Sequence, residues 1–352
     1  MAHDAVDEEG GAEQDEPIPD DAPQPTAVLI RPEDLRTSLG AIWRNLRQAY
    51  YVTPCWHAEF YVGLAYSGFI SVSQAVPARS GGESIPLLIP EIQRSYGVLH
   101  YANLHIERNV AKRAAHYELR FDTAFDDVLA ALCEYHENCW LLPEYCSLLR
   151  TLHKRGRMPV PSGASGAQFE VHSVELYDTR DGTLVAGEVG YAIGSLFTSL
   201  TGFTRAGHPS AGKVQLAGLA CVLEHSGSAL WNLGHPPREA NDRLPASMLY
   251  KREIGVTVMP RRAFLRQWIA ARDAPLLELT RAVETLRAHC TREGSGAHTP
   301  AGVPLGSLLK ARRLAQPPKG ATAQGARAGL PASPPFEDVA ERNQGVHASA
   351  PS

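Results

Sequence analysis

Apolar and polar positions follow two different periods along the chain, and each period predicts a different element. Apolar side chains spaced three and four residues apart indicate amphipathic helices, whereas strict alternation indicates strands with one buried face. The helical spacing predicts helices over 32–50, 57–67, 107–116, 125–132, 143–155, 213–225, 260–272 and 275–289. The remaining apolar segments predict strands over 69–73, 87–89, 96–103, 117–121, 169–177, 184–193, 196–203, 229–233 and 255–258.

The clearest of these segments form a predicted β-hairpin. Residues 169–177 alternate, Asp181 and Gly182 mark a tight turn, and residues 184–193 return. Because helices and short strands occur together without a repeating βαβ pattern, the chain is expected to be α+β, with an antiparallel sheet flanked by helices.

Composition divides the 352 residues into a foldable part and two tails. Residues 1–25 are acidic and contain no Lys or Arg, and from about 297 onward Pro, Ala, Gly and Ser dominate. Such segments bury too little apolar surface to offset the entropy lost on ordering. We therefore expect disordered tails at 1–30 and 292–352, an N-terminal domain over 31–121 and a second domain over 122–291.

Overall charge and cysteine usage exclude some classes of protein. The 34 basic and 38 acidic side chains give a net charge of −4, so any contact with nucleic acid must come from a local basic patch. No apolar run is long enough to predict a membrane-spanning helix. The six cysteines contain no C-x-x-C pair, which favours free thiols in a reducing compartment. The expectation is a cytoplasmic monomer without a targeting segment.

One helical segment is a candidate basic patch. Arg108, Lys112 and Arg113 occur without an intervening acid, which favours a phosphate contact, although a solvated helix face explains the same pattern. Lys213 ends a G-x-x-x-x-G-K stretch, but Val214 follows where a nucleotide-binding loop requires Ser or Thr for magnesium. An anion at this helix start remains an expectation, whereas ATP or GTP does not.

A carboxylate in the middle of a strand is the candidate catalytic group. In His172-Ser173-Val174-Glu175, alternation puts Ser173 and Glu175 on one face of the strand. A buried carboxylate requires either a structural partner or a ligand, and both interpretations stay open. Cys133, His136, Cys139 and Cys146 could be zinc ligands, but buried free cysteines explain them more simply, and no metal is expected.

Several motifs in a fixed order resemble the leucyl/phenylalanyl-tRNA–protein transferase family. They include Y-V-G-L-A-Y-S-G-F-I-S-V-S at 61–73, L-H-I at 104–106, C-W at 139–140, H-S-V-E-L at 172–176, L-V-A-G at 184–187, G-Y-A-I-G at 190–194 and P-R-R-A-F-L at 260–265. The resemblance spans about residues 50–270. It implies a small N-terminal α/β domain joined to a GNAT-like (acyl-CoA N-acyltransferase) domain with a mainly antiparallel sheet.

The resemblance also implies an activity, its partners and a site. Members of this family move an amino acid from tRNA to the N-terminal amine of an acceptor protein, which marks that protein for N-degron turnover. Aminoacyl-tRNA and the acceptor N-terminus would be the partners, with a Leu- or Phe-type donor and no cofactor. Lys112 and Arg113 match a basic pair facing the tRNA, to which we add Arg108 and Lys213.

The implied site residues follow from the same motifs. Glu175 matches the family glutamate of H-S-[IV]-E and would position the acceptor amine or a basic N-terminal residue. Asn232 matches the aspartate of a D-C-Q block and could polarise the ester carbonyl. The aminoacyl pocket would be walled by aromatic residues beside Ser173, namely Trp140, Phe197 and Phe203.

Two other functions compete with this one. The family's G-E-S-M-F-S stretch corresponds to S-L-T-G-F-T at 199–204, without its glutamate, which favours a catalytically silent tRNA- or peptide-binding homologue. An acyl-CoA-dependent N-acyltransferase would need a pyrophosphate loop that 205–212 only roughly approximates.

Overall fold

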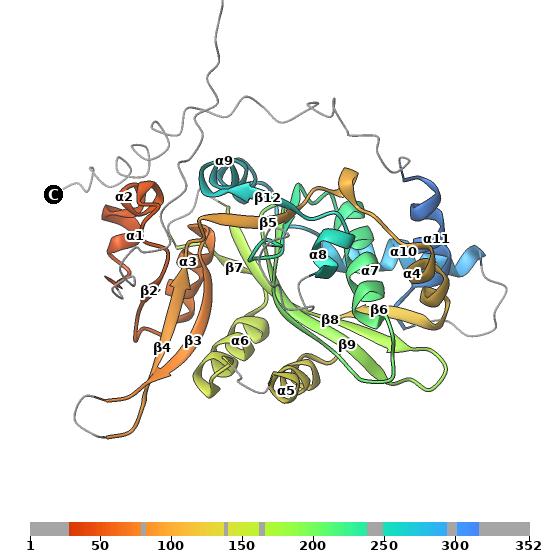
Figure 1. The fold of residues 1–352 in the computed structure, drawn as a ribbon, viewed down its shortest axis with the longest axis horizontal. Coiled ribbons are helices and arrows are strands. Elements are labelled where there is room, and N and C mark those ends of the chain that lie inside the picture. Colours follow the sequence, from red (N-terminus) through yellow and green to blue (C-terminus); the bar gives the residue numbers. More distant parts are fainter. Residues whose placement is uncertain are drawn as a thin grey trace, which may run out of the picture.

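A curled, mainly antiparallel sheet of nine strands organises the molecule (Figure 1). The computed structural model describes residues 28–78, 82–136, 140–161, 166–237, 249–293 and 301–316. The strands follow the order β12-β5-β11-β10-β9-β8-β6-β13, and β7 pairs with β8 beside this path. Their bounds are β5 (Ser95–Leu99), β6 (Tyr117–Phe121), β7 (Met158–Pro159), β8 (Gln168–Asp178), β9 (Leu184–Ile193), β10 (Leu196–Thr204), β11 (Leu230–Asn232), β12 (Thr257–Pro260) and β13 (Val303–Pro304). The predicted α+β class is confirmed.

The β8–β9 hairpin forms the centre of the sheet, as its alternating pattern predicts. Its antiparallel register pairs Val171 with Tyr191 and Glu175 with Gly187. The next turn, from β9 into β10, requires Gly194, because its φ is +52° and an added Cβ would lie 2.4 Å from the Ala271 carbonyl oxygen. The three strands thereby form one continuous antiparallel ribbon.

The pair β10–β11 is parallel, in contrast to the antiparallel pairs around it. A parallel pair needs a crossover connection, and α7 (Ala211–His225) supplies it between the two strands. This crossover places α7 against one face of the sheet, where it contacts β8, β9 and β10.

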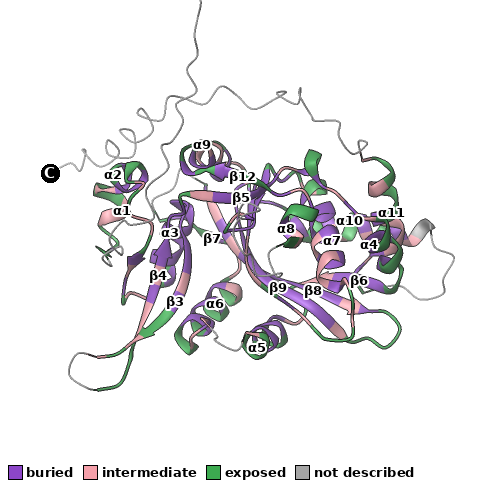
Figure 2. Ribbon diagram, viewed as in Figure 1, coloured by how far each residue is buried: buried purple, intermediate pink, exposed green. Residues whose placement is uncertain are grey.

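Helices cover both faces of the sheet, and Figure 2 shows the buried residues concentrated between the layers. On one face, α5 (Phe125–Tyr135) and α6 (Pro143–Arg155) pack over a core that includes Phe169 and Tyr191. On the opposite face, α7 covers a second core that includes Phe197 and Trp231. The other helices in this part of the chain are α4 (Arg108–Arg113), α8 (Leu249–Glu253), α9 (Arg261–Arg272), α10 (Leu279–Glu293) and α11 (Leu305–Leu314).

The N-terminal part differs from the single helix predicted over 32–50. The chain forms two short helices there, α1 (Asp34–Thr37) and α2 (Leu39–Arg44), separated at Ser38. Beyond α2, the buried Arg261 guanidinium donates hydrogen bonds to the carbonyl oxygens of Asn45 and Gln48, at 2.7 and 3.2 Å. A tertiary contact thus takes the carbonyl groups that a longer helix would have used internally.

Small elements complete this part of the chain. They are β1 (Val28–Leu29), β2 (Tyr51–Val52), α3 (Ala58–Tyr66), β3 (Ile70–Val76), β4 (Ile85–Glu91) and the 3₁₀ turns η1 (Tyr101–Asn103) and η2 (Ala114–His116). β3 and β4 form an antiparallel hairpin, and β1 pairs with β2. β5 and β6, which belong to the predicted N-terminal domain, lie in the same sheet as β8 to β12. The boundary near residue 121 stays a prediction.

The C-terminal end of the described chain is ordered where composition predicts a tail over 292–352. Residues 301–316 form β13 and α11, and the side chains of Val303, Leu305 and Leu309 are fully buried. These three side chains join the core covered by α7, and their burial stabilises a segment that composition alone assigns to the tail. The predicted tail residues 1–27 and 317–352 lie outside the described residues. Within the described ranges, no helix combines the length and apolar character needed to cross a membrane.

Candidate active site

The sheet opens where β10 and β11 stop pairing. Their parallel ladder ends at Thr198 and Asn232, after which β10 continues to Thr204 while β11 ends. Beyond Asn232 the chain turns toward β5, where Leu233 donates its backbone N–H to the Gly97 carbonyl. The edge of β10 beyond Thr198 therefore has no described strand paired on that side. We call this unpaired edge, which lies beside α7, the opening between β10 and β11.

A buried glutamate lies on the α7 side of this opening. Glu188 of β9 is 3% exposed, and both of its carboxylate oxygens accept hydrogen bonds. Ser199 Oγ donates to Oε1 at 2.5 Å, and Gln215 Nε2, from α7, donates to Oε2 at 3.0 Å. The indole of Trp231 in turn donates to Ser199 Oγ at 2.9 Å. The hydroxyl of the half-buried Ser199 therefore connects the Glu188 carboxylate with the opening.

Burial changes the acidity of Glu188. It raises the pKa of the carboxyl to about 7, although the hydrogen bond from Ser199 partly opposes the shift. A carboxyl group with this pKa is present in both protonation states near neutral pH, which is the condition for accepting and returning a proton.

A buried lysine lies at the end of β11. Lys251 of α8 donates from Nζ to the carbonyl oxygens of Leu233 and His235, at 2.7 and 2.6 Å. Burial lowers the pKa of this amine to about 8. The preceding residue, Tyr250, interacts electrostatically with Glu188, and its own pKa is raised, mainly by burial. Two buried ionisable groups with pKa values shifted toward neutrality therefore flank the opening.

Glu175, the predicted catalytic glutamate, lies on the opposite face of the sheet. Its Oε1 accepts a hydrogen bond from Ser173 Oγ at 2.5 Å, which confirms that these two residues share a face. Its Oε2 accepts from the Thr123 hydroxyl at 2.9 Å and from the Thr123 backbone N–H at 3.4 Å. Burial raises the pKa of Glu175. These partners join β8 to the segment before α5, which is the structural alternative that the sequence left open.

Asn232 faces the same side of the sheet as Glu175 but lies far from it. Its Oδ1 accepts the Gly234 backbone N–H at 3.0 Å, and its Nδ2 lies 3.5 Å from Thr198 Oγ1. The strand registers separate Glu175 and Asn232 by three strand spacings and four residues along β8, about 20 Å measured along the sheet. The structure does not bring the two predicted catalytic residues together, and their roles stay predictions.

The predicted pocket residues divide between the two cores. Trp140 is half-buried, with its ring centroid 5.5 Å from that of Tyr145, and it packs against the same core as Phe203. Phe197 is fully buried in the other core, below α7. A pocket walled by all three aromatic residues stays a prediction.

The predicted tRNA-binding residues gather around α4. Lys112 and Arg113 are exposed and line, with Asn109 and His116, a surface hollow of about 290 Å³. Arg113 also donates hydrogen bonds to the Pro209 carbonyl and to Ser210 Oγ, at 3.1 and 2.6 Å, and so ties α4 to the loop before α7.

Lys213 is placed differently from the other basic residues. Its Nζ forms ion pairs with Glu253 at 2.6 Å and with Glu107 at 3.7 Å. Two carboxylates therefore neutralise the lysine that the sequence assigned to tRNA binding, which leaves α4 as the stronger anion surface.

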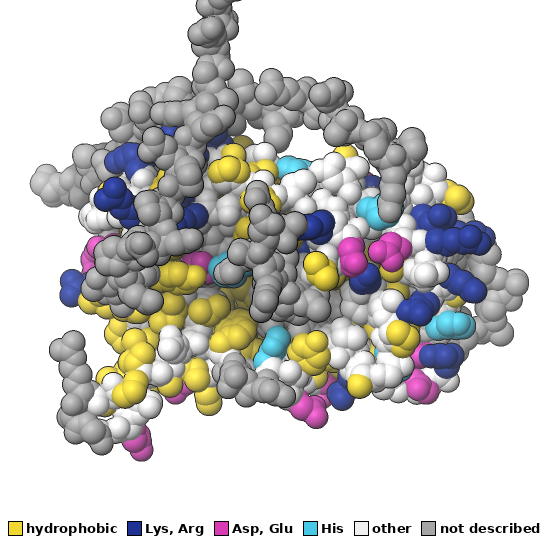
Figure 3. All heavy atoms as spheres, in the orientation of Figure 1, with side chains coloured by type: hydrophobic (Ala, Val, Ile, Leu, Met, Phe, Trp, Pro, Cys, Tyr) yellow, Lys and Arg dark blue, Asp and Glu magenta, His cyan; other side chains and the backbone are white. Residues whose placement is uncertain are grey.

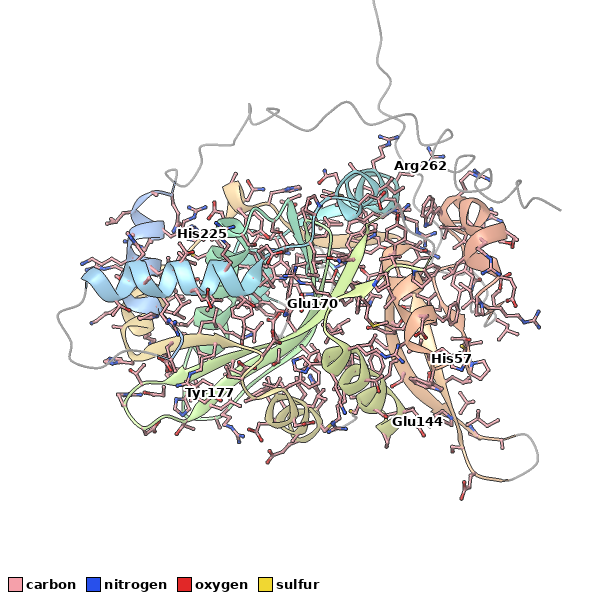
Figure 4. All side chains as sticks on the ribbon, turned by 180° about the vertical axis from the view of Figure 1, so that it is seen from behind. His57, Glu144, Glu170, Tyr177, His225 and Arg262 are labelled. Atoms are coloured by element: carbon pink, nitrogen blue, oxygen red, sulfur yellow. The ribbon has the colours of Figure 1, made fainter. Side chains whose placement is uncertain are left out.

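A histidine–aspartate pair joins the middle of β8 to Asp122, the residue after β6. Asp122 accepts hydrogen bonds from His172 Nδ1 at 2.8 Å and from His153 Nε2 at 3.2 Å. These hydrogen bonds outweigh the effect of burial and hold the pKa of Asp122 below its ordinary value. The second ring nitrogen of His172 lies 3.7 Å from the Glu170 carboxylate, which Figure 4 shows over the middle of the sheet.

Comparison with known proteins shows which family this part of the chain resembles. The sequence profile of the leucyl/phenylalanyl-tRNA protein transferases matches residues 98–267, a range that contains the opening and its polar residues. Over this range, just under half of its length, the chain is similar to this family. The transferase of Aromatoleum aromaticum is 37% identical over 137 residues, which are 38% of this chain and 51% of that protein. The transferase of Tolumonas auensis is 30% identical over 182 residues, covering 50% and 66% of the two chains.

The similarity to the transferase family is partial in length. The chain spans about half the length of the Aromatoleum relative. Among solved structures, L-PGS from Bacillus licheniformis aligns with 51% of this chain and 65% of its own, at 10% identity and a TM-score of 0.30, too low to support any argument.

The motifs did not indicate Glu188, although the local sequence carries a signal for it. It is the one charged residue in the apolar segment 184–193, so the argument that selected Glu175 applies to it equally. Its partners Ser199 and Gln215 lie 11 and 27 residues away in the sequence, and only the fold brings them together.

Proposed function

We propose that this protein is an aminoacyl-tRNA–protein transferase that moves a Leu- or Phe-type amino acid from tRNA to the N-terminal amine of an acceptor protein. Similarity to the transferase family supports this activity. The single observation that carries it is the Glu188–Ser199 pair at the opening between β10 and β11. The same similarity supports the proposal of a cytoplasmic role in N-degron turnover.

The transfer reaction requires one group that accepts a proton from the attacking amine. The acceptor amine attacks the ester carbonyl, so a C–N bond forms and the bond from that carbon to the ribose oxygen breaks. An N-terminal amine has an ordinary pKa of about 7.7–8.0, so part of it is already neutral at physiological pH. Binding both substrates at one site supplies much of the rate acceleration.

Glu188 and Ser199 are proposed to carry the proton. The Ser199 hydroxyl donates to Glu188 and faces the opening, so it can take a proton from the attacking amine as Glu188 accepts its own. Glu188 then returns this proton through Ser199 to the departing ribose oxygen. Protons and charge balance over the cycle, and no cofactor is required.

We also propose that residues 122–291 form a GNAT-like domain that follows a smaller N-terminal domain. The parallel β10–β11 pair, which separates beside the crossover helix α7, supports this assignment, because such an opening gives an acyl donor access to strand backbone.

A direct assay tests the proposed activity. Purified protein is mixed with radiolabelled Leu-tRNA or Phe-tRNA and a peptide that begins with Arg or Lys. Transfer of label to the peptide is expected, and the same peptide acetylated at its N-terminus should accept none. Tight tRNA binding without transfer to either free peptide would instead establish the catalytically silent homologue.

A further inference from the structure

The C-terminal segment 301–316 lies beyond the part of the chain that matches the transferase family. It is nevertheless built into the fold, since β13 pairs with β6 and α11 contacts α4, α7 and η2. Gly306 packs closely on η2, where an added Cβ would come 3.0 Å from Ala115 Cα. The segment therefore holds α11 in a fixed position beside α4.

α11 runs antiparallel to α4. Its N-terminal end lies at Ala115, just after α4, through Gly306. Its C-terminal end lies before α4, because Gln316 accepts the Ile106 backbone N–H at 3.2 Å and donates to the Ile106 carbonyl at 3.3 Å. Arg312 adds a hydrogen bond of 2.7 Å to the Tyr101 carbonyl.

This arrangement places two pairs of cations on neighbouring helices. Arg108 and Lys112 lie one turn apart on α4, and Lys310 and Arg313 lie about one turn apart on α11. Gly306, Lys310 and Arg313 are spaced by four and three residues, so they lie along one side of α11. This row of residues starts at Gly306, which contacts η2. Figure 3 shows Lys and Arg side chains gathered over these two helices.

The surface lacks the acids that would neutralise it. Residues 108–117 and 301–316 contain no Asp or Glu. Arg312 forms an ion pair with Glu224 at 2.8 Å. Within the described ranges, no ion pair is formed by the two pairs of cations named above, Arg108 with Lys112 and Lys310 with Arg313.

We propose that α4 and α11 form one phosphate-binding surface for the sugar–phosphate backbone of the tRNA donor. The inference rests on the proposed function for the identity of the nucleic acid. It adds Lys310 and Arg313, which lie outside the family-matched range, to the tRNA contacts. Two acid-free rows of cations fit a polyanion with regularly spaced charges, and such contacts are independent of base sequence.

A membrane surface fits this site less well than nucleic acid does. An amphipathic helix binds lipid through an exposed apolar face, but α11 directs Leu305 and Leu309 into the core. Leu314, the last residue of α11, is 72% exposed, but a single apolar side chain does not form an apolar face. The cations therefore dominate this surface, and the tRNA phosphates supply the complementary charge.

The test compares two double variants of the full chain that remove the same charge. Lys310→Ala with Arg313→Ala alters α11, whereas the control, Arg36→Ala with Arg266→Ala, removes two exposed arginines from α1 and α9. Thermal midpoints establish that both variants are folded. The dissociation constant for uncharged tRNA is then measured by fluorescence anisotropy at several salt concentrations.

The α11 variant should bind tRNA about tenfold more weakly at moderate salt, and its log–log salt slope should fall by about 0.7–0.9 for each lost phosphate contact. The control should match wild type. Unchanged affinity and slope in the α11 variant would overturn the proposal, as would a wild-type protein that does not bind tRNA. Weakened binding to anionic phosphatidylserine vesicles with unchanged tRNA binding would also overturn it.

A minimal donor separates this proposal from the proposed function. Leucyl-adenosine carries the reactive ester but no acceptor stem, so both double variants should use it as wild type does. Only transfer from full Leu-tRNA should slow in the α11 variant. If wild type transfers from neither donor, the proposed activity fails, while the tRNA-binding comparison still decides the surface.

Discussion

Glu175 and Glu188 are buried glutamates on adjacent strands, yet they face opposite sides of the sheet. Glu175 accepts hydrogen bonds from Ser173 and Thr123, which fasten β8 to the segment before α5. Glu188 is bound by Ser199 and Gln215 at the opening between β10 and β11. Burial raises the pKa of both carboxyl groups. Burial alone therefore does not distinguish the two carboxyl groups, whereas the positions of their partners do.

The largest expected effect comes from Glu188→Gln, which keeps the shape of the side chain but removes the proton acceptor. Transfer from Leu- or Phe-tRNA should fall by about 10²–10⁴-fold, the usual contribution of general acid–base catalysis. Radiolabel transfer at pH 7.5 measures the effect, with Glu144→Gln on the exposed start of α6 as a control. A Glu188→Gln rate within twofold of wild type would remove Glu188 from the mechanism.

Glu175→Ala should act on folding instead of chemistry. The hydroxyls of Ser173 and Thr123 would lose their buried acceptor and a cavity would remain, so the free energy of unfolding should fall by about 2–4 kcal/mol. Urea denaturation measures this fall, and transfer per folded molecule should be retained. Should transfer per folded molecule drop as far as in Glu188→Gln, the sequence prediction that Glu175 positions the amine would be favoured.

Glu188 should also make stability depend on pH. An unfolded glutamate loses its proton near pH 4.5, whereas the folded protein keeps it until about pH 7. The folded state binds more protons between these values, so the free energy of unfolding should fall as pH rises through this window, by about 3 kcal/mol. The stability that protonated Glu188 contributes is fully present below pH 4.5 and is lost as pH rises to about 7.

The Glu188→Gln variant should lose most of this pH dependence, because glutamine does not ionise. A smaller fall of the same sign should remain, since the pKa of Glu175 is raised as well. Urea titrations at pH 4.5 and 7.5 give the comparison. Equal slopes in wild type and Glu188→Gln would show that Glu188 does not carry the shifted pKa.

The smallest expected effect is that of Ser199→Ala. It removes the hydroxyl between Glu188 and the opening, and a water molecule can replace that hydroxyl, so we expect transfer to slow about tenfold. Loss of the hydrogen bond should raise the pKa of Glu188 further, because that bond favours the ionised form. The rate should therefore reach its plateau at a higher pH than in wild type; a shift toward lower pH would contradict this arrangement.

Local patterns predicted the elements, and distant contacts determined how they assemble. The β8–β9 hairpin and the start of α6 at Pro143 follow from alternation and turn residues, which act over a few positions. The early end of the helix predicted over 32–50, at Arg44, coincides with hydrogen bonds from Arg261, more than 200 residues away. The order of 301–316 depends on β6 and α4, whose positions no local pattern indicates.

The candidate site shows the same limit. Alternation correctly placed Ser173 and Glu175 on one face, but it could not show that Thr123 would be their partner. The family motif directed attention to position 200, where a leucine replaces the glutamate, while Glu188 lies on the neighbouring strand. Positions 188 and 200 are brought near each other only by the pairing register of β9 and β10.

The most direct test of the account is the pH dependence of single-turnover transfer in wild type and Glu188→Gln. Leu-tRNA and an Arg-initiated peptide are used under saturating conditions. The wild-type rate should rise with an apparent pKa of about 7, set by Glu188, in addition to the ionisation of the acceptor amine near 8. Glu188→Gln should lose the lower ionisation and keep only that of the amine. A Glu188→Gln profile with both ionisations and the wild-type rate would contradict the assignment of Glu188 as the proton acceptor.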